Sequence, residues 1–338
     1  MANELIPITA DQMRIAAAGV VPLPPMQAPI WDHFTQARRR RDFGRYLFRI
    51  DGKDHALISL VYDEVHSVPF LWAKAGPVWL RGQTPAHERA LRDALVEEVR
   101  RRDRSVVFIR LHARYSASDT RELLQSITYD KTALIRCFPE ESDTVAALPK
   151  EGQRSWRRAA KKIAGRDVVF RTYDADTLDD TTYAQIYDVL EETARRDGFH
   201  PHRRDLYRTL LTSLGAQYAR IYVIELDGVV VAWNFVVEND QRAYVYYGAH
   251  SHAARDVLAM EYLDIRTAVE LGQRGVVSVD LMGVDSPRVP ELYGVGRYKR
   301  RFGEIVDTDG AWDLPVRQAK YHALVVAKRL RDRVRTRH

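Results

Sequence analysis

Apolar and polar residues alternate in the second half of the chain in a pattern typical of antiparallel strands. Residues 219–251 read as three strands, and Asp227-Gly228 falls where a two-residue hairpin turn is expected. Apolar positions at helical spacing then predict a helix over residues 255–273, followed by a strand over 276–283. This half therefore predicts the order hairpin, strand, helix, strand.

The first half repeats that order. Residues 44–65 predict a hairpin that turns at Asp51-Gly52. A strand, a helix and a strand are predicted after it, over residues 70–80, 85–103 and 105–113. A helix is also predicted before each hairpin, over residues 29–41 and 181–197. The repetition predicts an internal duplication, with two tandem α+β domains that each have the element order of an acetyltransferase (GNAT)-like domain.

The segments outside the repeats predict the domain boundaries. Residues 138–153 carry two prolines, acids and turn formers, and favour a linker. A helix is predicted from about Val316 to the C-terminus, and we expect it to return to the first domain because its apolar residues need a partner: Ala323, Val326, Leu330 and Val334. We therefore expect a first domain of residues 1–147 plus 316–338 and a second domain of residues 148–315.

Composition changes this picture little. The chain has 338 residues, of which 46% are hydrophobic and 29% charged, and it is long enough for two cores. Its longest apolar runs fall short of the roughly 20 residues of a membrane helix, and no basic segment leads into an apolar run at the N-terminus, so we expect a cytoplasmic protein. The single cysteine, Cys137, lies in an apolar run and predicts a buried structural thiol, not a disulfide or a nucleophile.

The net charge of +6 is concentrated in two segments. One is the basic C-terminal helix, and the other is a helix predicted over residues 150–166. In the second helix, Trp156, Ala160 and Ile163 form an apolar stripe. Cations cover the other faces: Arg154, Arg157, Arg158, Lys161 and Lys162. Two interpretations stay open, a solvated helix face and a surface for phosphate-bearing ligands such as RNA.

A third basic segment lies near the end of the second copy, where residues 296–303 read GRYKRRFG. On its own it is equally consistent with a solvated turn between strands. Taken as strand-like, it would point Lys299 and Arg300 to opposite sides.

Together with four other motifs, this segment resembles the FemABX aminoacyltransferases over nearly the whole chain. The motifs occur in the family's order: QRSWRRAAKKIAGRDV, TARRDGFHPHRRDLY, AYVYYGAHS, VDLMGV and GRYKRRFGEIVDTDGAWDLP. The family has two acetyltransferase-type domains in tandem, and its members transfer amino acids from aminoacyl-tRNA to the stem peptide of a peptidoglycan precursor. The chain lacks the long charged helical insertion of some members, so it is most similar to the compact, FemX-like subset.

The resemblance implies catalytic residues and acceptor-binding residues. It places Tyr298 and Lys299 in the active cleft, where an ammonium group can stabilise the oxyanion of the reaction. Tyr244, with its hydroxyl group, is the third catalytic candidate. The acceptor-binding candidates are Arg203, Tyr207, Tyr246 and Arg38. Arg203 and Tyr207 are four residues apart and are expected on one helix face, and Tyr244 and Tyr246 alternate along one strand and are expected to point into the same cleft.

One position departs from the family pattern. Thr35 stands where the family has a phosphate-binding lysine, and the candidates that replace it are Arg38 or a neighbour in the run ARRRR. The five cations of residues 150–166 are the candidates for tRNA binding.

The implied partners are aminoacyl-tRNA and a UDP-MurNAc-pentapeptide or lipid-linked muropeptide, with peripheral membrane contact and a monomeric state as further expectations. No cofactor is expected. His200 and His202 lack further residues at ligand spacing, so no metal site is expected either. Asp280 has two readings, a group that orients an amine or a lysine and a strand-end cap.

Three other functions stay open at this point. They are amide synthesis on a peptide natural product, a tRNA-binding module without catalysis, and an acyl-CoA acetyltransferase. The last is disfavoured because residues 249–260 have no glycine-rich loop for a pyrophosphate before the helix.

Overall fold

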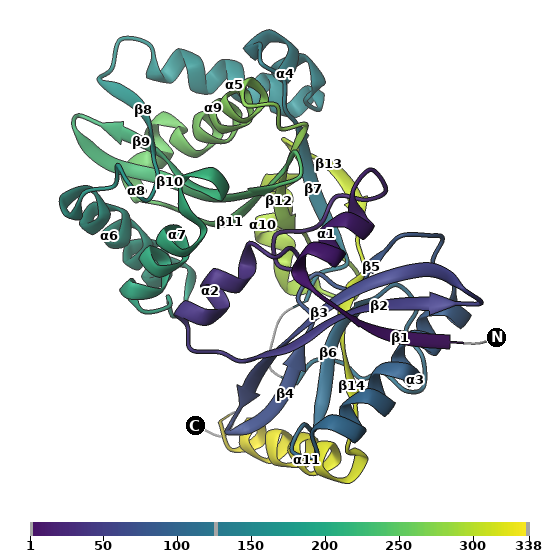
Figure 1. The fold of residues 1–338 in the computed structure, drawn as a ribbon. Helices are drawn as coiled ribbons and strands as arrows, with labels where there is room; N and C mark the ends of the chain where they lie inside the picture. The colour runs from purple at the N-terminus through teal and green to yellow at the C-terminus, as the bar shows by residue number, and fades with distance from the viewer. Residues whose placement is uncertain (1–2, 125–127, 336–338) are drawn as a thin grey trace. The chain divides into compact units, whose positions relative to one another are not determined.

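The computed structural model describes residues 3–124 and 128–335 (Figure 1). It divides into a first unit, Met1–Asp130 with Thr308–His338, and a second unit, Lys131–Asp307. The first unit is therefore assembled from both ends of the chain.

The first unit is built on a sheet in the order β1-β2-β3-β4-β6-β14, with β5 paired to β3. Only the pair β4 and β6 is parallel among these strands. The strands are β1 (Asn3–Ile8), β2 (Asp42–Ile50), β3 (Lys53–Val65), β4 (Val68–Trp72), β5 (Val78–Trp79), β6 (Phe108–Ala113) and β14 (Gly310–Pro315). The helices are α1 (Ala10–Ala17), α2 (Trp31–Ala37), α3 (Pro85–Arg102) and α11 (Gln318–Arg335).

The second unit has a sheet in the order β13-β7-β12-β11-β10-β9-β8, in which only β11 and β12 are parallel among the described strands. The strands are β7 (Lys131–Arg136), β8 (Val168–Tyr173), β9 (Ala219–Leu226), β10 (Val229–Asn239), β11 (Arg242–His250), β12 (Ser278–Gly283) and β13 (Glu304–Asp307). The helices are α4 (Glu141–Ala147), α5 (Lys150–Ile163), α6 (Asp180–Asp197), α7 (Arg204–Tyr218), α8 (His252–Val257), α9 (Ala259–Gln273), the short 3-10 helix η1 (Pro290–Leu292) and α10 (Tyr293–Lys299).

The two units share one plan, so the predicted duplication and the α+β class are confirmed. In each unit an antiparallel hairpin leads to a strand, and a helix crosses over to a parallel neighbour, β4-α3-β6 and β11-α9-β12. Both hairpins turn at the predicted Asp-Gly pairs. These residues have the positive φ that a tight hairpin turn requires, 48° and 74° at Asp51-Gly52 and 52° and 76° at Asp227-Gly228.

The units begin and end elsewhere than the sequence predicted. Strand β7 belongs to the second unit because it pairs with β12 and β13, which moves the first boundary from residue 147 to residue 130. Strand β14 belongs to the first unit because it pairs with β6, which moves the second boundary from residue 315 to residue 307. Each sheet is thus completed by a strand that lies beyond its repeat in the sequence.

The segment predicted as a linker is largely helical. It holds α4 and the start of α5. Thr144 of α4 is buried, and its hydroxyl donates to the carbonyl of Phe138 at 3.2 Å and accepts from the same residue's N–H at 3.1 Å. The two prolines, Pro139 and Pro149, flank α4 and do not mark an extended connection.

The C-terminal helix α11 returns to the first unit as predicted, but through a different face (Figure 1). Tyr321, Leu324 and Val325 pack in a cluster with Phe70 and Phe108. Of the face predicted to be buried, Ala323, Val326 and Leu330 are exposed. Tyr321 carries the largest buried side chain of this helix and sets its rotation, and the prediction left it out. The Val334 side chain and residues 336–338 lie outside what is described.

Helices cover both faces of the second sheet. On one face, α9 packs with α4 and α5, and on the other α6 and α7 pack on β9, β10 and β11. Figure 1 shows α5 and α9 side by side and α6 and α7 together. The buried cluster on the first face includes Trp156 of α5, which stacks on Tyr262 of α9 with ring centroids 5.1 Å apart.

Candidate active site

The segment GRYKRRFG is neither a strand nor an open turn. Its first half is the end of helix α10, and the chain turns after it through Phe302, which is 1% exposed. Two glycines let neighbouring backbone come close. A Cβ at Gly303 would lie 2.8 Å from the Cβ of Ala133, and a Cβ at Gly152 of α5 would lie 2.3 Å from the carbonyl oxygen of Arg301. The basic helix α5 is therefore in contact with this segment.

Lys299 is partly buried at the end of α10. Its Nζ donates a hydrogen bond to the carbonyl oxygen of Gly283 at 3.0 Å, at the end of β12. Burial lowers the pKa of Lys299 to about 8, and the nearby carboxylates of Asp280 and Asp264 oppose that shift. An ammonium group with this pKa is charged near neutral pH and can still release its proton.

Asp264 is the residue of this site that sequence reasoning missed. It lies on α9 and is 3% exposed. Its Oδ2 accepts from the hydroxyl of Tyr298 at 2.8 Å, and its Oδ1 accepts from Nδ2 of the fully buried Asn234 at 2.8 Å. Burial raises the pKa of Asp264 to about 6, although both hydrogen bonds favour the carboxylate. The pKa of the Tyr298 hydroxyl is raised by the same burial and by Asp264, so Tyr298 stays a donor.

A signal for Asp264 exists in the sequence. Asp264 is an acidic residue whose two neighbours in the predicted helix, Leu263 and Ile265, are apolar. A charged residue on the buried side of a helix is uncommon without a partner. The partners Asn234 and Tyr298 come from residues 30 and 34 positions away, and no local pattern connects them.

Of the two interpretations left open for Asp280, the structure shows the strand-end cap, and the orienting role stays a prediction. Its Oδ1 accepts from the Thr132 hydroxyl and from the backbone N–H of Met282, the latter at 2.6 Å, and Met282 has φ of 67°. These bonds hold an irregular backbone at the end of β12, as a strand-end cap does. The carboxylate also lies close enough to Lys299 to favour its charged form.

Tyr244 and Tyr246 occupy different environments on β11. Tyr244 is the register partner of Asp280, at the last position where β11 and β12 pair. Burial, with the Asp280 charge, raises the pKa of Tyr244 to about 12. Tyr246 lies at a β-bulge, where the register passes from Val245 to Tyr247, so the simple alternation from Tyr244 does not hold.

The acceptor candidates Arg203 and Tyr207 do not share one face of a helix. Arg203 precedes the first turn of α7, and its side chain is 89% exposed and paired with Asp205 at 3.2 Å. Tyr207 is 5% exposed, its ring packs against Tyr247 at 4.8 Å, and its hydroxyl accepts from the N–H of His202 at 3.1 Å. Only Arg203 of this pair is open to a ligand.

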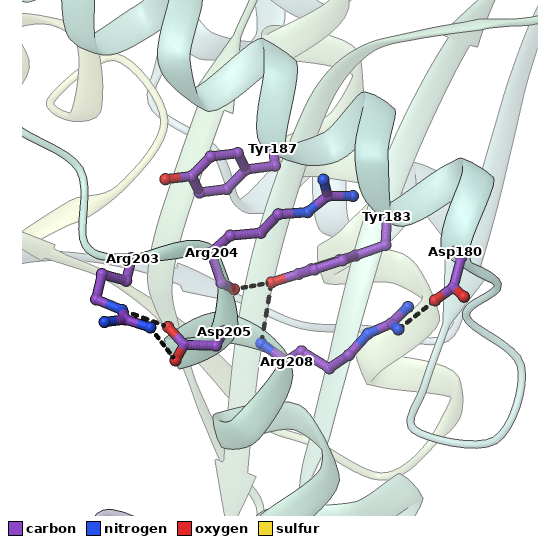
Figure 2. Close-up of a pocket in the computed structure, with 7 residues that line it drawn as sticks. All are labelled: Asp180, Tyr183, Tyr187, Arg203, Arg204, Asp205 and Arg208. Atoms are coloured by element: carbon purple, nitrogen blue, oxygen red, sulfur yellow. Dashed lines mark hydrogen bonds and ion pairs between the residues drawn. The ribbon is translucent and has the colours of Figure 1, made fainter.

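Arg203 lines an open cavity of about 600 Å³ between the start of α6 and the start of α7 (Figure 2). The lining residues are Asp180, Tyr183, Tyr187, Arg203, Arg204, Asp205 and Arg208. Figure 2 shows rings and guanidinium groups in alternation, with Arg204 between Tyr187 and Tyr183 and Arg208 beyond Tyr183. The guanidinium carbons lie 5.3 Å and 4.5 Å from the Tyr183 centroid for Arg204 and Arg208. Sequence reasoning missed these two arginines, although their spacing of four places them on one helix face.

The five tRNA candidates are all exposed on α5. The opposite side of the helix is fixed as predicted, with Trp156 buried and Ala160 and Ile163 partly buried against the core. Lys162 also donates to the carbonyl of Asp256 at 2.7 Å. The role of these five cations in RNA binding stays a prediction.

Arg38 lies in the first unit, at the end of α2. Its guanidinium lies 5.7 Å from the ring centroid of Phe34, and its side chain is exposed. Thr35 is 7% exposed and donates to the carbonyl of Trp31 at 3.1 Å, so its position in the helix is buried. Lys74 lies close enough to Arg38 for the charges to interact, and burial lowers the pKa of Lys74 to about 8.

Three further features that the sequence raised are Cys137, a metal site and a pyrophosphate-binding loop. Cys137 is buried, and its pKa is raised to about 12 by burial. In the part of the chain that is described, no three His, Cys, Asp or Glu residues gather as a metal site would require. The connection between β11 and α9 carries the short helix α8 in place of a glycine-rich loop.

Comparisons with known proteins agree with this fold. Residues 150–300 match the model of the acetyltransferase (GNAT) domain. The solved structure of FemX matches with a TM-score of 0.72 at 13% identity and covers 95% of this chain and 99% of its own. A putative lysylphosphatidylglycerol synthetase C-terminal domain from Agrobacterium fabrum matches with a TM-score of 0.52 at 13% identity, covering 94% and 95%.

A tandem GNAT protein from the clavulanic acid biosynthesis pathway matches with a TM-score of 0.50 at 12% identity, covering 93% and 99%. No curated protein matches the sequence significantly. Within residues 3–124 and 128–335, no helix has both the length and the apolar character needed to cross a membrane.

Proposed function

We propose that this chain, which has the tandem GNAT fold of FemX, transfers an amino acid from aminoacyl-tRNA to an amine of a peptidoglycan-precursor stem peptide. The observation that carries the proposal is the cluster around Lys299. A partly buried ammonium group lies beside two carboxylates, Asp264 and Asp280, on a motif that resembles the family's catalytic segment.

The reaction replaces an ester bond by an amide bond. The amine nitrogen attacks the ester carbonyl, a C–N bond forms, and the C–O bond to the ribose breaks. The amine gives up one proton and the ribose oxygen takes one. An enzyme for this reaction supplies a cation for the oxyanion, an acceptor for the first proton and a donor for the second.

Lys299 is suited to the first and third tasks. Its ammonium group stabilises the oxyanion while the tetrahedral intermediate exists, and with a pKa of about 8 it can then give a proton to the ribose oxygen. The hydrogen bond to the Gly283 carbonyl fixes the position of Nζ.

Asp264 is suited to the second task through Tyr298. The amine proton passes to the Tyr298 hydroxyl oxygen as the hydroxyl proton moves to Asp264, over the existing hydrogen bond of 2.8 Å. A carboxyl group with a pKa of about 6 is ionised near neutral pH and takes up a proton more readily than an exposed aspartate. After the product leaves, proton exchange with solvent returns Lys299 to its protonated form and Asp264 to its ionised form.

The substrates would be held by separate cationic surfaces. The exposed cations of α5 suit the tRNA backbone, and α5 is in contact with the catalytic segment at Gly152. The arginines of the cavity in Figure 2 suit the diphosphate of a precursor, since guanidinium groups bind phosphate with directional hydrogen bonds. We place this reaction in the cytoplasm.

Thr35 bears on the choice of acceptor. Thr35 departs from the family's phosphate-binding lysine, which favours testing acceptors other than a UDP-linked precursor. The decisive experiment incubates the protein with total tRNA charged with labelled amino acids and with candidate acceptors, and identifies the product by mass. The acceptors are UDP-linked and lipid-linked muropeptides, a peptide natural product and phosphatidylglycerol. A labelled amide on a muropeptide supports the proposal, and transfer only to another acceptor, or to none, contradicts it.

A further inference from the structure

Helix α11 has two apolar faces, and the fold of the first unit uses one of them. Tyr321, Leu324 and Val325 pack into that unit. Apolar residues also recur at helical spacing on the opposite, exposed side: Ala319, Ala323, Val326 and Leu330. Val326 is 40% exposed and Leu330 is 57% exposed, and Figure 1 shows the helix at one end of the unit. The described part of the first unit therefore leaves this outer stripe uncovered.

Cations flank the outer stripe on both sides. At about 3.6 residues per turn, Lys320 and Arg329 lie about a quarter turn to either side of Leu330. Both side chains are exposed, and neither pairs with an acid among the described residues. Residues 317–330 contain no acid, and residues 317–338 hold eight Lys or Arg residues against Asp332 alone. The outer face of α11 thus combines an apolar stripe with net positive charge.

This combination fits an anionic lipid surface. A helix that lies in the plane of a bilayer inserts its apolar side between the head groups, while Lys and Arg contact the lipid phosphates. An RNA backbone would contact the cations but has no use for Val326 and Leu330. A second copy of this chain would bring two sets of cations together, which is unfavourable. Of these occupants, only the lipid surface matches both the stripe and its charged borders.

We propose that the outer face of α11 binds an anionic membrane surface, with Val326 and Leu330 inserted between head groups and with Lys320 and Arg329 on lipid phosphates. Two partly exposed apolar side chains bury little area, so positive charge supplies most of the attraction. Binding is therefore reversible and weakens as salt is added. The inference goes beyond the proposed transfer reaction and does not depend on it.

The test is co-sedimentation of the full chain with vesicles of equal parts phosphatidylglycerol and phosphatidylcholine, compared with vesicles of phosphatidylcholine alone. Wild type should bind the anionic vesicles more tightly, and salt should reduce the difference. The double variant Lys320→Gln with Arg329→Gln should weaken binding to the anionic vesicles by about tenfold or more. Val326→Gln with Leu330→Gln should weaken it by about tenfold, because the apolar contact is lost. Thermal midpoints should not change, since all four side chains are exposed.

Matched controls lie elsewhere in the first unit. Lys53→Gln with Arg81→Gln removes two exposed cations near the start of β3, and Val65, at the end of that strand, is the residue that packs in the cluster of α11. Ile15→Gln with Val20→Gln removes two apolar side chains that are 71% and 59% exposed. Both control variants should bind the anionic vesicles as wild type does.

Three results would overturn the proposal. The first is equal binding of wild type to the two kinds of vesicle. The second is an α11 variant of either kind that binds the anionic vesicles as tightly as wild type. The third is a wild type that binds no vesicles but loses tRNA binding on Lys320→Gln with Arg329→Gln, which would make α11 an RNA surface. Vesicle binding requires no transfer, so failure of the proposed function leaves this inference standing.

Discussion

The two copies of the fold use the same structural position in opposite ways. In each, an aromatic residue on the hairpin strand is the last register partner of a charged residue on the parallel strand, Trp72 with Arg110 in the first unit and Tyr244 with Asp280 in the second. In the first unit the charge is fully neutralised. In the second unit the charged residue, Asp280, lies beside Lys299, whose Nζ donates a hydrogen bond to the carbonyl oxygen of Gly283.

The neutralised position is closed by the C-terminal segment. Arg110 and Asp313 are 3% and 0% exposed, and Nε donates to Oδ1 at 2.7 Å. The Tyr321 hydroxyl of α11 adds a bond to Oδ2 of Asp313 at 3.1 Å. Three aromatic rings surround the guanidinium: Phe70, Trp72 and Phe108. Such a network fixes a fold and leaves no group for chemistry.

The second position stays chemically available. Lys299 is partly exposed, and burial has lowered its pKa to about 8. Asp264 has a raised pKa of about 6. Pairs of groups whose environments bring their pKa values toward neutrality are typical of active sites. Duplication thus supplies two equivalent positions, of which one stabilises the fold and one is suited to react.

Breaking the first position should give the largest effect, and it should fall on stability. Arg110→Met leaves the Asp313 carboxylate buried without its cation, which costs about 3–5 kcal/mol. Urea unfolding measures this loss. The double variant Arg110→Met with Asp313→Leu should recover most of the lost stability. If Arg110→Met alone is as stable as wild type, the first position does not stabilise the fold and the two positions do not differ in this way.

A substitution at the second position should lower the rate of transfer. Lys299→Met removes a preorganised cation and should lower single-turnover transfer by about 10² to 10³. Stability should hold, because the lowered pKa means that burying this ammonium group is itself unfavourable. The matched control is Arg297→Met, an exposed cation of the same helix.

The sequence suggested a different control, Arg300, on the expectation that it points away on a strand. The segment is helical and Arg300 holds Asp285, so Arg300→Met should disturb the site as well. A near-normal rate for Lys299→Met, with its thermal midpoint unchanged, would refute the catalytic assignment.

Asp264 should show that the second site costs stability. The pKa of Asp264 is about 6 in the folded state and an ordinary 3.8 in the unfolded state. Between about pH 4 and pH 6 the folded state therefore binds more protons than the unfolded state, and stability falls as pH rises through this range. Asp264→Asn removes this loss and should stabilise the fold at pH 7 by up to roughly 3 kcal/mol. Thermal midpoints measured from pH 4 to pH 7 test this.

The hydrogen bonds allow that substitution. Asn234 can turn its amide, because its Oδ1 has no hydrogen-bond partner among the described residues. Asp264→Asn should lose transfer activity. A variant that is active and less stable than wild type would contradict both the role of Asp264 as a proton acceptor and its cost to stability.

The smallest expected effect concerns RNA binding. Charge reversal at Arg158 and Lys162 should weaken binding to all tRNAs alike and reduce its salt dependence. Reversal of Arg14, an exposed cation of the first unit, is the control. Equal affinity of the α5 variant and wild type at low salt would exclude α5 as the RNA surface.

Local patterns predicted much of this fold, because each hairpin depends on residues near in sequence. The Asp-Gly turns, the crossover helices and the apolar side of α5 were correct for this reason. The strands β7 and β14 were assigned to the wrong domains, since their partners lie far away and no periodicity records such pairing. The face of α11 was wrong because Tyr321, which determines its rotation, gains its partners only in the folded unit.

The site was predictable only where a motif is continuous. Tyr298 and Lys299 lie in one conspicuous segment, whereas Asn234 and Asp264 become partners through packing of α9 on β10. The arginines next to Arg203 form a cavity only when α6 and α7 bring two tyrosines to them. The sequence thus singled out the segment that we propose to react, but not the residues that tune its pKa values.

The proposed mechanism requires that the Lys299 ammonium takes part in the reaction with a pKa of about 8. The most direct measurement is the ratio of single-turnover rates of wild type and Lys299→Arg from pH 6.5 to pH 9.5. Arginine stays charged throughout this range, and titration of the substrates cancels in the ratio. We predict a constant ratio below about pH 7 and a fall approaching tenfold per pH unit above pH 8. A ratio that does not change with pH would show that the Lys299 ammonium has no part in the rate.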